Sequence, residues 1–237
     1  MKKHLSFFSG LIIILASSCM PSITGNGDVI TQTREATNFT KVNLNIAGDV
    51  SITKANNFTV KVEGESNILE LLKTEVINDM LVIEFDEWGI RNFKSLKIYI
   101  TMPALNGVHV SGSGKIESSS AFSAVDFDMS LSGSGDIVLK SLDVNNVDAR
   151  ISGSGNIHLE NNTPADYFDM KISGSGDLHA QNFQTKNFAG FISGSGNCRV
   201  NVSETLEAKV SGSGDIHYTG NPEVNASVSG SGKVRAL

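Results

Sequence analysis

One tetrapeptide, Ser-Gly-Ser-Gly, occurs seven times in this chain and constrains its fold more than any other feature. The copies begin at Ser111, Ser132, Ser152, Ser173, Ser193, Ser211 and Ser229, and successive copies are 21, 20, 21, 20, 18 and 18 residues apart. A nearly fixed period of this length is typical of stacked repeats, in which each repeat contacts mainly its neighbours. The array therefore predicts one elongated repeat domain.

Apolar and polar residues alternate around each motif. In one repeat the odd-numbered positions from Val147 to Leu159 are apolar or glycine, and the positions between them are polar. Period two indicates half-buried strands, and a phase that continues through the glycines keeps one face inward throughout. The inward residues that flank the motif are aliphatic in every repeat apart from Cys198. Cys198 is therefore expected to be a buried, inert thiol.

A period near twenty leaves no room for a helix between the strands. We therefore predict an all-β fold, a repeat β-solenoid of the single-stranded parallel β-helix type, with coils about 4.8 Å apart. Parallel crossovers are usually right-handed, and the same sense is expected here. Glycine in a strand costs roughly 0.5–1 kcal/mol relative to alanine, so the repeated glycines need a structural reason. They line a narrow edge between opposing walls or turn a corner with positive φ, and we favour the corner.

The first half of the chain is less regular. It contains alternating segments, for example Phe58 to Val62 and Leu81 to Phe85, and one degraded motif copy, Ala47-Gly48-Asp49-Val50. Asn78-Asp79 predicts a tight turn between two strands. The predicted organisation is a signal peptide over residues 1–18, a tether over 19–36, an irregular β part over 37–107 and the repeat solenoid over 108–237, with 37–237 forming one continuous domain.

The N-terminus indicates export. Lys2 and Lys3 precede a short apolar run that ends in Ala16-Ser17-Ser18-Cys19. This pattern is typical of a secretory signal, and the run is too short to cross a membrane. A cysteine directly after small residues resembles the lipobox of bacterial lipoproteins, in which Cys19 carries the lipid. The expected location is thus a bacterial membrane, with the outer membrane favoured and either face open; cleavage without lipidation is the alternative.

Charge and motif context exclude several classes of partner. Loss of residues 1–18 removes two lysines and takes the formal charge from −6 to −8. Without a basic cluster to neutralise phosphates, nucleic acid is not an expected partner.

Phosphate-binding glycine loops precede a helix, whereas a strand follows here, which argues against a nucleotide cofactor. Asp136, Asn156, Asp177, Asn197 and Asp215 alternate after the motif, which favours a solvated ladder over a calcium site. No cofactor is expected.

Candidate functional residues are few. Trp88 sits in a predicted loop and could stack on a sugar ring, although packing over the core is the favoured interpretation. His158 and His179 occupy neighbouring rungs of an outward ladder, but no third metal ligand is evident, so an exposed polar ladder is favoured and no metal is predicted. Outward aspartates such as Asp128 and Asp169 look scattered. We therefore predict no catalytic residues.

The repeats, together with Ile100-Thr101-Met102-Pro103-Ala104-Leu105 before the first motif and the lipoprotein start, are similar to a known family. From Phe39 to Leu237 the chain resembles the bacterial family called "putative auto-transporter adhesin, head GIN domain". The resemblance implies an all-β, solenoid-like fold carried by envelope lipoproteins. It supplies no catalytic residues.

The leading hypothesis is a non-enzymatic envelope lipoprotein that binds a glycan or protein ligand on its stacked β surface. One alternative is a carbohydrate-active enzyme on the same scaffold, which would need a groove of clustered carboxylates. Another is a structural or assembly protein that associates end to end, because an open strand edge at the last rung invites pairing.

Overall fold

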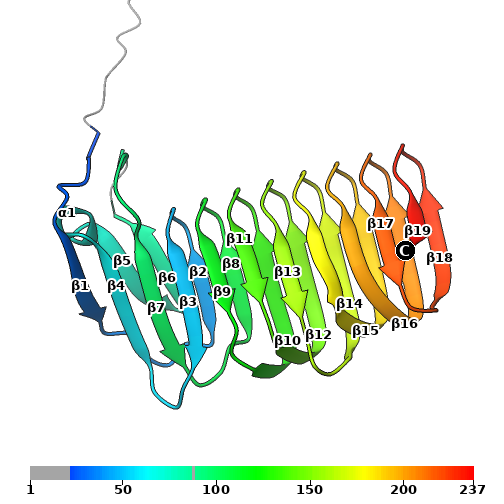
Figure 1. The fold of residues 1–237 in the computed structure, drawn as a ribbon, viewed down its shortest axis with the longest axis horizontal. Helices are drawn as coiled ribbons and strands as arrows, with labels where there is room; N and C mark the ends of the chain where they lie inside the picture. Colours follow the sequence, from blue (N-terminus) through cyan, green and yellow to red (C-terminus); the bar gives the residue numbers. More distant parts are fainter. Residues whose placement is uncertain (1–21, 87–88) are drawn as a thin grey trace, which may run out of the picture.

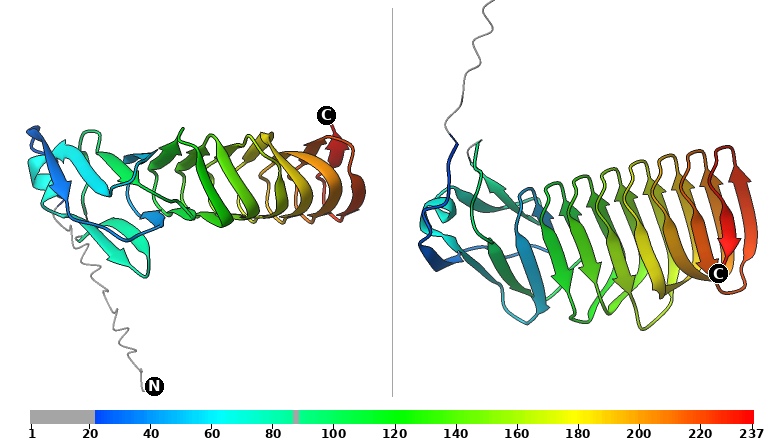
Figure 2. Two further views of the ribbon diagram at one scale, coloured as in Figure 1. Left: turned by 90° about the horizontal axis from the view of Figure 1, so that it is seen from below. Right: turned by 45° about the horizontal axis from the view of Figure 1, so that its top comes forward.

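The computed structural model describes residues 22–86 and 89–237, which form an elongated solenoid with two facing walls (Figure 1). These ranges contain nineteen strands and one short helix. Viewed from below in Figure 2, the strands of the two walls alternate as the chain winds from coil to coil. The predicted all-β solenoid is confirmed.

Wall A, as we call the first wall, is a parallel sheet in which each strand pairs with its counterpart in the next coil. β15 and β16 begin on the other wall and bend across, so only their last residues belong to wall A. In spatial order wall A contains β6 (Met80–Phe85), β2 (Lys41–Leu44), β8 (Gly107–Val110), β10 (Phe122–Leu131), β12 (Leu142–Ile151), β14 (Ala165–Ile172), β15 (Leu178–Ile192), β16 (Cys198–Val210) and β18 (Glu223–Val228).

Wall B is the second parallel sheet and lies opposite wall A. The first residues of β15 and β16 complete it between β13 and β17. In spatial order its other strands are β7 (Lys97–Met102), β3 (Asp49–Lys54), β9 (Lys115–Ser118), β11 (Asp136–Leu139), β13 (Ile157–Glu160), β17 (Ile216–Thr219) and β19 (Val234–Ala236).

Antiparallel strands close the N-terminal end. β5 (Leu72–Ile77) pairs with β6, β4 (Thr59–Glu65) pairs with β7, and β1 (Val29–Arg34) pairs with β4, while α1 (Ser66–Leu69) joins β4 to β5. The predicted turn at Asn78-Asp79 is confirmed, and both residues have positive φ. β1 lies inside the segment expected to be a tether. That expectation is wrong for β1, because its alternating pattern pairs along the whole of β4.

The coils do not stack in chain order at this end. β2 pairs with β6 on one side and with β8 on the other, and β3 likewise lies between β7 and β9. The degraded copy at Gly48 therefore stacks on the first intact motif, at Gly114, although the two are far apart in sequence. The intervening chain forms the antiparallel end, and then returns to the opposite side of the β2–β3 coil.

The Ser-Gly-Ser-Gly motifs form the bends between the walls and line the upper edge in Figure 1. The predicted corner is correct, but its predicted cause is wrong. Positive φ occurs among the described glycines only at Gly27, Gly89 and Gly220, outside the motifs. In every motif after the first, a Cβ added to either glycine would lie 1.7–2.1 Å from the carbonyl oxygen of the equivalent glycine one coil earlier. The glycines are therefore required by backbone stacking.

Hydrogen bonds explain why the bends approach so closely. In most motifs the first glycine accepts N–H bonds from two residues of the next motif, as when Gly153 O receives Ser175 N at 3.0 Å and Gly176 N at 3.1 Å; Gly133 O receives Ser154 N alone. These bonds satisfy main-chain groups that the bend removes from the sheet ladder. A side chain in this position would separate the coils.

The interior consists of columns that run through the stack. The inward residues on both sides of the motif are buried from Val110 and Ile116 to Val210 and Ile216, as predicted. Val228, in the last described coil, is 44% exposed because β18 has a neighbour on one side only. Three phenylalanine rings at Phe168, Phe183 and Phe188 pack edge to face in the middle of the array, with centroids 5.4–5.6 Å apart.

Candidate binding surfaces

Two of the predicted candidates, Cys19 and Trp88, lie outside the described residues. Cys198 is buried, and burial raises the pKa of its thiol far above the ordinary value. The thiol is therefore protonated and unreactive at neutral pH, in line with its position in the inward column. In the part of the chain that the structure describes, no helix is long and apolar enough to span a membrane.

His158 and His179 are neighbours on the outer face of wall B. Their rings stack with centroids 4.4 Å apart and an interplanar angle of 15°. Arg199, His217 and Arg235 continue the same column, and Arg235 Nε lies 2.6 Å from His217 Nε2. No group of three or more His, Cys, Asp or Glu side chains is placed to hold a metal ion within residues 22–86 and 89–237. The column is a stack of imidazole and guanidinium groups.

The alternating Asp and Asn residues beside this column bind the backbone. Asp136 Oδ1 accepts the main-chain N–H of Asn156 at 3.0 Å, and Asp177 accepts that of Asn197 at 2.7 Å. Asn197 Oδ1 in turn accepts the N–H of Asp215. These side chains are half-buried and link successive coils at the bend. The expected solvated ladder is therefore a structural ladder, in which one oxygen each of Asp136, Asp177, Asn197 and Asp215 accepts a main-chain N–H of the next coil.

Lower pH should destabilise the fold through three histidines. Burial lowers the pKa of His109, His179 and His217 below its ordinary value, reinforced at His179 by the charge of His158 and at His217 by that of Arg235. The unfolded chain therefore binds protons more readily, so stability that is present above about pH 6.5 is lost as pH falls towards the folded pKa values.

The urea midpoint should accordingly be lower at pH 5.5 than at pH 7.5. A His217→Gln variant should show a smaller difference between the two pH values, because one of the three groups is removed. The pKa of Asp143 is also lowered, by hydrogen bonds from Asn162 and Thr163 that outweigh its desolvation, but its contribution is lost near pH 4 and below, outside this window. Equal midpoints at the two pH values would contradict the prediction.

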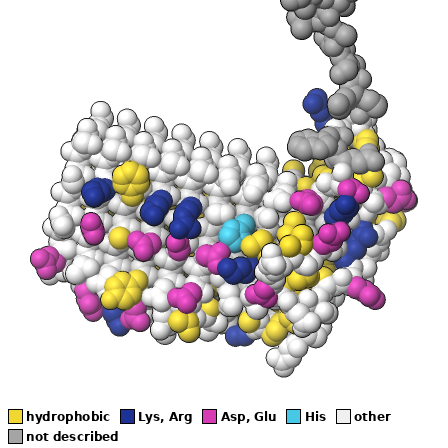
Figure 3. Space-filling model, turned by 180° about the vertical axis from the view of Figure 1, so that it is seen from behind, with side chains coloured by type: hydrophobic (Ala, Val, Ile, Leu, Met, Phe, Trp, Pro, Cys, Tyr) yellow, Lys and Arg dark blue, Asp and Glu magenta, His cyan; other side chains and the backbone are white. Residues whose placement is uncertain are grey.

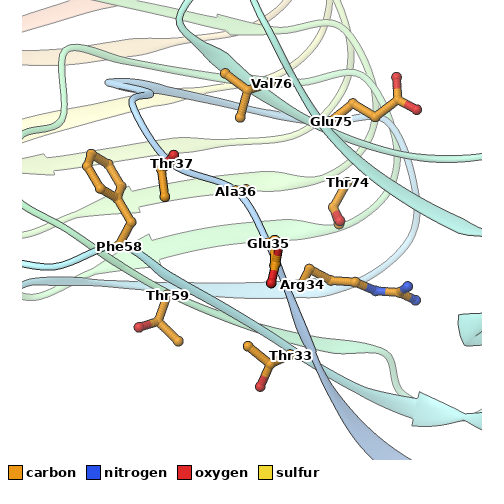
Figure 4. Close-up of a pocket in the computed structure, with 10 residues that line it drawn as sticks. All are labelled: Thr33, Arg34, Glu35, Ala36, Thr37, Phe58, Thr59, Thr74, Glu75 and Val76. Carbon is orange, nitrogen blue, oxygen red and sulfur yellow. The ribbon is translucent and has the colours of Figure 1, made fainter.

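A wide hollow lies at the N-terminal end, between β1, the segment after it, β4 and β5 (Figure 4). It measures about 850 Å³ and is lined by four threonines, Arg34, two glutamates, Ala36, Phe58 and Val76. In Figure 4 the side chains of Arg34 and Glu75 extend away from its centre. Arg34 donates a hydrogen bond to the Leu69 carbonyl and therefore serves the fold. The hollow lacks a convergent set of polar groups.

The outer face of wall A carries two charged columns, visible in Figure 3 as a basic row above an acidic row. The strand register aligns their members. The acidic column contains Asp128, Asp148, Asp169 and Glu207. The basic column contains His109, Arg150, Lys171 and Lys209, with Ser130 between the first two. The aspartates are thus ordered, and the expectation of scattered carboxylates is wrong, because the strand register aligns Asp128, Asp148 and Asp169 on neighbouring strands.

The N-terminal members of these columns are paired. His109 Nε2 lies 2.8 Å from Asp128, which also contacts Lys41, and Arg150 lies 2.7 Å from Asp148. Towards β14–β16 the pattern changes. Ala189 takes the place of an acid and Phe191 that of a base, and a hollow of about 200 Å³ opens over β14, β15 and β16. Aligning the repeats on their motifs would have revealed both departures in the sequence.

A family model described as "Putative auto-transporter adhesin, head GIN domain" matches residues 38–222. A crystal structure described as a putative adhesin from Bacteroides fragilis is 26% identical, covers 91% of this chain and 100% of its own, and superposes with a TM-score of 0.86. Comparison with curated proteins gives no match.

Two further crystal structures share the fold at lower identity. One, described as a putative lipid binding protein from Parabacteroides distasonis, is 22% identical, with a TM-score of 0.75 over 92% of this chain and 100% of its own. The other, described as a putative adhesin from Parabacteroides merdae, is 19% identical, with a TM-score of 0.72 over 91% of this chain and 99% of its own.

Proposed function

Because the chain belongs to the family "putative auto-transporter adhesin, head GIN domain", we propose that it is a non-enzymatic binding module of the bacterial cell envelope. It recognises a glycan or protein partner on the outer face of wall A. The observation that carries this proposal is the pair of charged columns, fixed at strand spacing on a sheet whose inner side is a closely packed core. Such a face is preformed, and binding to it costs little ordering of the protein.

The hydrogen bonding of the carboxylates supports a non-enzymatic role. Asp128 and Asp148 are held in ion pairs, and Asp136 and Asp177 accept main-chain N–H groups of the next coil. A general acid or base needs a carboxyl group that is poised to exchange a proton near neutral pH. These four carboxylates are instead held in ion pairs or in hydrogen bonds to the main chain.

A binding screen tests the proposal. The folded protein is applied to one panel of envelope and host glycans and to one panel of envelope and host proteins. Saturable binding to a member of either panel is expected, and it should weaken when Arg150 and Asp148 are both replaced by alanine. A folded protein that binds neither panel contradicts the proposal, and turnover of a polysaccharide would replace it with an enzymatic function.

Membrane attachment through Cys19 is the second part of the proposal. The supporting observation is the small-residue run Ala16-Ser17-Ser18 directly before Cys19. The expected result is incorporation of labelled fatty acid and recovery of the protein in the membrane fraction. A Cys19→Ala variant should lose the label and leave that fraction. Export of an unlabelled wild-type protein cleaved at another bond would contradict lipidation.

A further inference from the structure

We propose that the hollow over Ala189 binds one sugar ring of a neutral glycan. This inference rests on the proposed function and gives the binding module a ligand class and a site. We call the site the β15 hollow. It is lined on the outer face of wall A by Tyr167 and Asp169 of β14, Asn187 and Ala189 of β15, and Thr205 and Glu207 of β16, with Phe191 of β15 beside it.

The first argument is that the repeat departs from its own columns at this place. The register aligns Asp148, Asp169, Ala189 and Glu207 across four neighbouring strands, and only Ala189 is small and uncharged. In the next column Phe191 lies between Lys171 and Lys209. Stacked coils favour like residues in a column, since each packs against its counterpart. Ser130 also interrupts the basic column, but among the wall A strands β10, β12, β14, β15 and β16 only β15 lacks a charged residue in both columns. The small side chain of Ala189 leaves the hollow open.

The second argument is the exposure of two aromatic side chains, one in the lining of the hollow and one beside it. Tyr167 is 61% exposed and Phe191 is 39% exposed, and they stand on adjacent strands on opposite sides of Ala189. Their counterparts in neighbouring coils are polar, so the fold does not require aromatic rings here. A pyranose has an apolar face of C–H groups, and an exposed aromatic ring offers the matching flat surface.

The third argument is the set of polar groups. Asp169 and Glu207 lie on either side of Ala189, on strands about 9.6 Å apart, and neither takes part in an ion pair with another described residue. Carboxylates accept hydrogen bonds from sugar hydroxyls. Asn187 is held in place, because its Oδ1 accepts the Thr205 hydroxyl at 2.7 Å and its Nδ2 donates to the Asp166 carbonyl at 3.0 Å.

Charge and size identify the class of glycan. The lining contains two carboxylates and no basic side chain, so it repels sulfated and sialylated rings and favours a neutral one. A volume of about 200 Å³ is below the roughly 300–1,000 Å³ of pockets that enclose a drug-sized ligand. It suits one sugar ring of a longer chain.

The floor of the site is rigid. Beneath Ala189, the rings of Phe168 and Phe188 meet edge to face with centroids 5.4 Å apart. Gly190, the inward neighbour of Ala189, makes room for this packing, since a Cβ there would lie 2.5 Å from the Phe188 ring. A preformed floor lowers the cost of ordering on binding.

The test measures binding by NMR titration and on a glycan array. The probes are methyl pyranosides of glucose, galactose, mannose and N-acetylglucosamine, oligosaccharides of the same sugars, and sulfated and sialylated oligosaccharides. Tyr167→Ala removes one aromatic ring, and Ala189→Gln fills the hollow with a side chain that continues the column. Each variant should bind the neutral probes at least about tenfold more weakly than the wild type, with an unchanged urea midpoint.

Tyr99→Ala is the matched control. Tyr99 is 40% exposed on wall B, beside a separate hollow lined by Thr31, Thr59 and Lys61, and its loss should leave binding unchanged. Neutral binding that survives Ala189→Gln, or that Tyr99→Ala abolishes, overturns this inference and leaves the binding module intact. Binding only to charged glycans or only to proteins likewise overturns this inference and leaves the proposed binding module intact. Binding to neither panel overturns the inference and the proposed function together.

Discussion

Replacing Gly155 by alanine should lower the free energy of unfolding by about 3 kcal/mol or more. The new Cβ would lie 1.7 Å from the carbonyl oxygen of Gly135 in the preceding coil. Backbone cannot rotate away as a flexible side chain can, so the two coils must separate. Separation weakens the hydrogen bonds between these two bends, in which Gly133 O accepts the N–H of Ser154 and Leu131 O accepts those of Ser152 and Gly153. Overpacking that forces backbone shifts typically costs 1–3 kcal/mol, and a contact this short belongs at the upper end of that range.

Urea denaturation followed by circular dichroism measures this change. Ser154→Ala is the matched control, because Ser154 is the exposed neighbour of Gly155, and its substitution should change stability by less than about 0.5 kcal/mol. Gly48→Ala should fall between the two, since its Cβ would lie 3.2 Å from the Leu96 carbonyl oxygen. If Gly155→Ala is as stable as Ser154→Ala, the motif glycines are not explained by backbone stacking.

Phe168→Ala should destabilise the protein by about 3–5 kcal/mol. Phe168 is 1% exposed and contacts the rings of Phe183 and Phe188 at centroid distances of 5.6 and 5.4 Å. Truncation removes this buried surface and leaves a cavity that parallel strands on both sides prevent from closing. The lost contacts lie in the middle of the array, where a neighbouring coil packs on each side of Phe168.

Two controls separate packing from a general effect of substitution. Val125→Ala, at a position 65% exposed on β10, should cost less than about 0.5 kcal/mol. Phe168→Leu retains much of the buried volume and should recover most of the loss. The measurement is again the urea midpoint and slope. A loss below about 1 kcal/mol for Phe168→Ala would show that the three rings are not the central packing contact of the array.

The β15 hollow could not be predicted from local sequence patterns. Its walls come from aligned residues that are 20 or 18 positions apart along the chain, such as Asp169, Ala189 and Glu207. Their spacing varies because β15 pairs with β16 through register shifts near Ala180 and Thr185. A fixed repeat length therefore does not align these three residues with one another. Counting back four positions from each Ser-Gly-Ser-Gly motif does align them. The stacked pair His158 and His179, which needs only the motif spacing, was predicted correctly as neighbours.

The sequence by itself determined the solenoid from Gly107 onward. A strand offers a side chain only two faces, so the alternation around residues such as Ile151 and Ile157 was enough to assign the buried columns and the period of the coils. Only the tertiary structure decided how the N-terminal end is built and why the motif contains glycine. The β2–β3 coil lies between strands that are distant in sequence, and the Gly155 clash is with a neighbouring coil. Both depend on contacts between coils, which local patterns do not record.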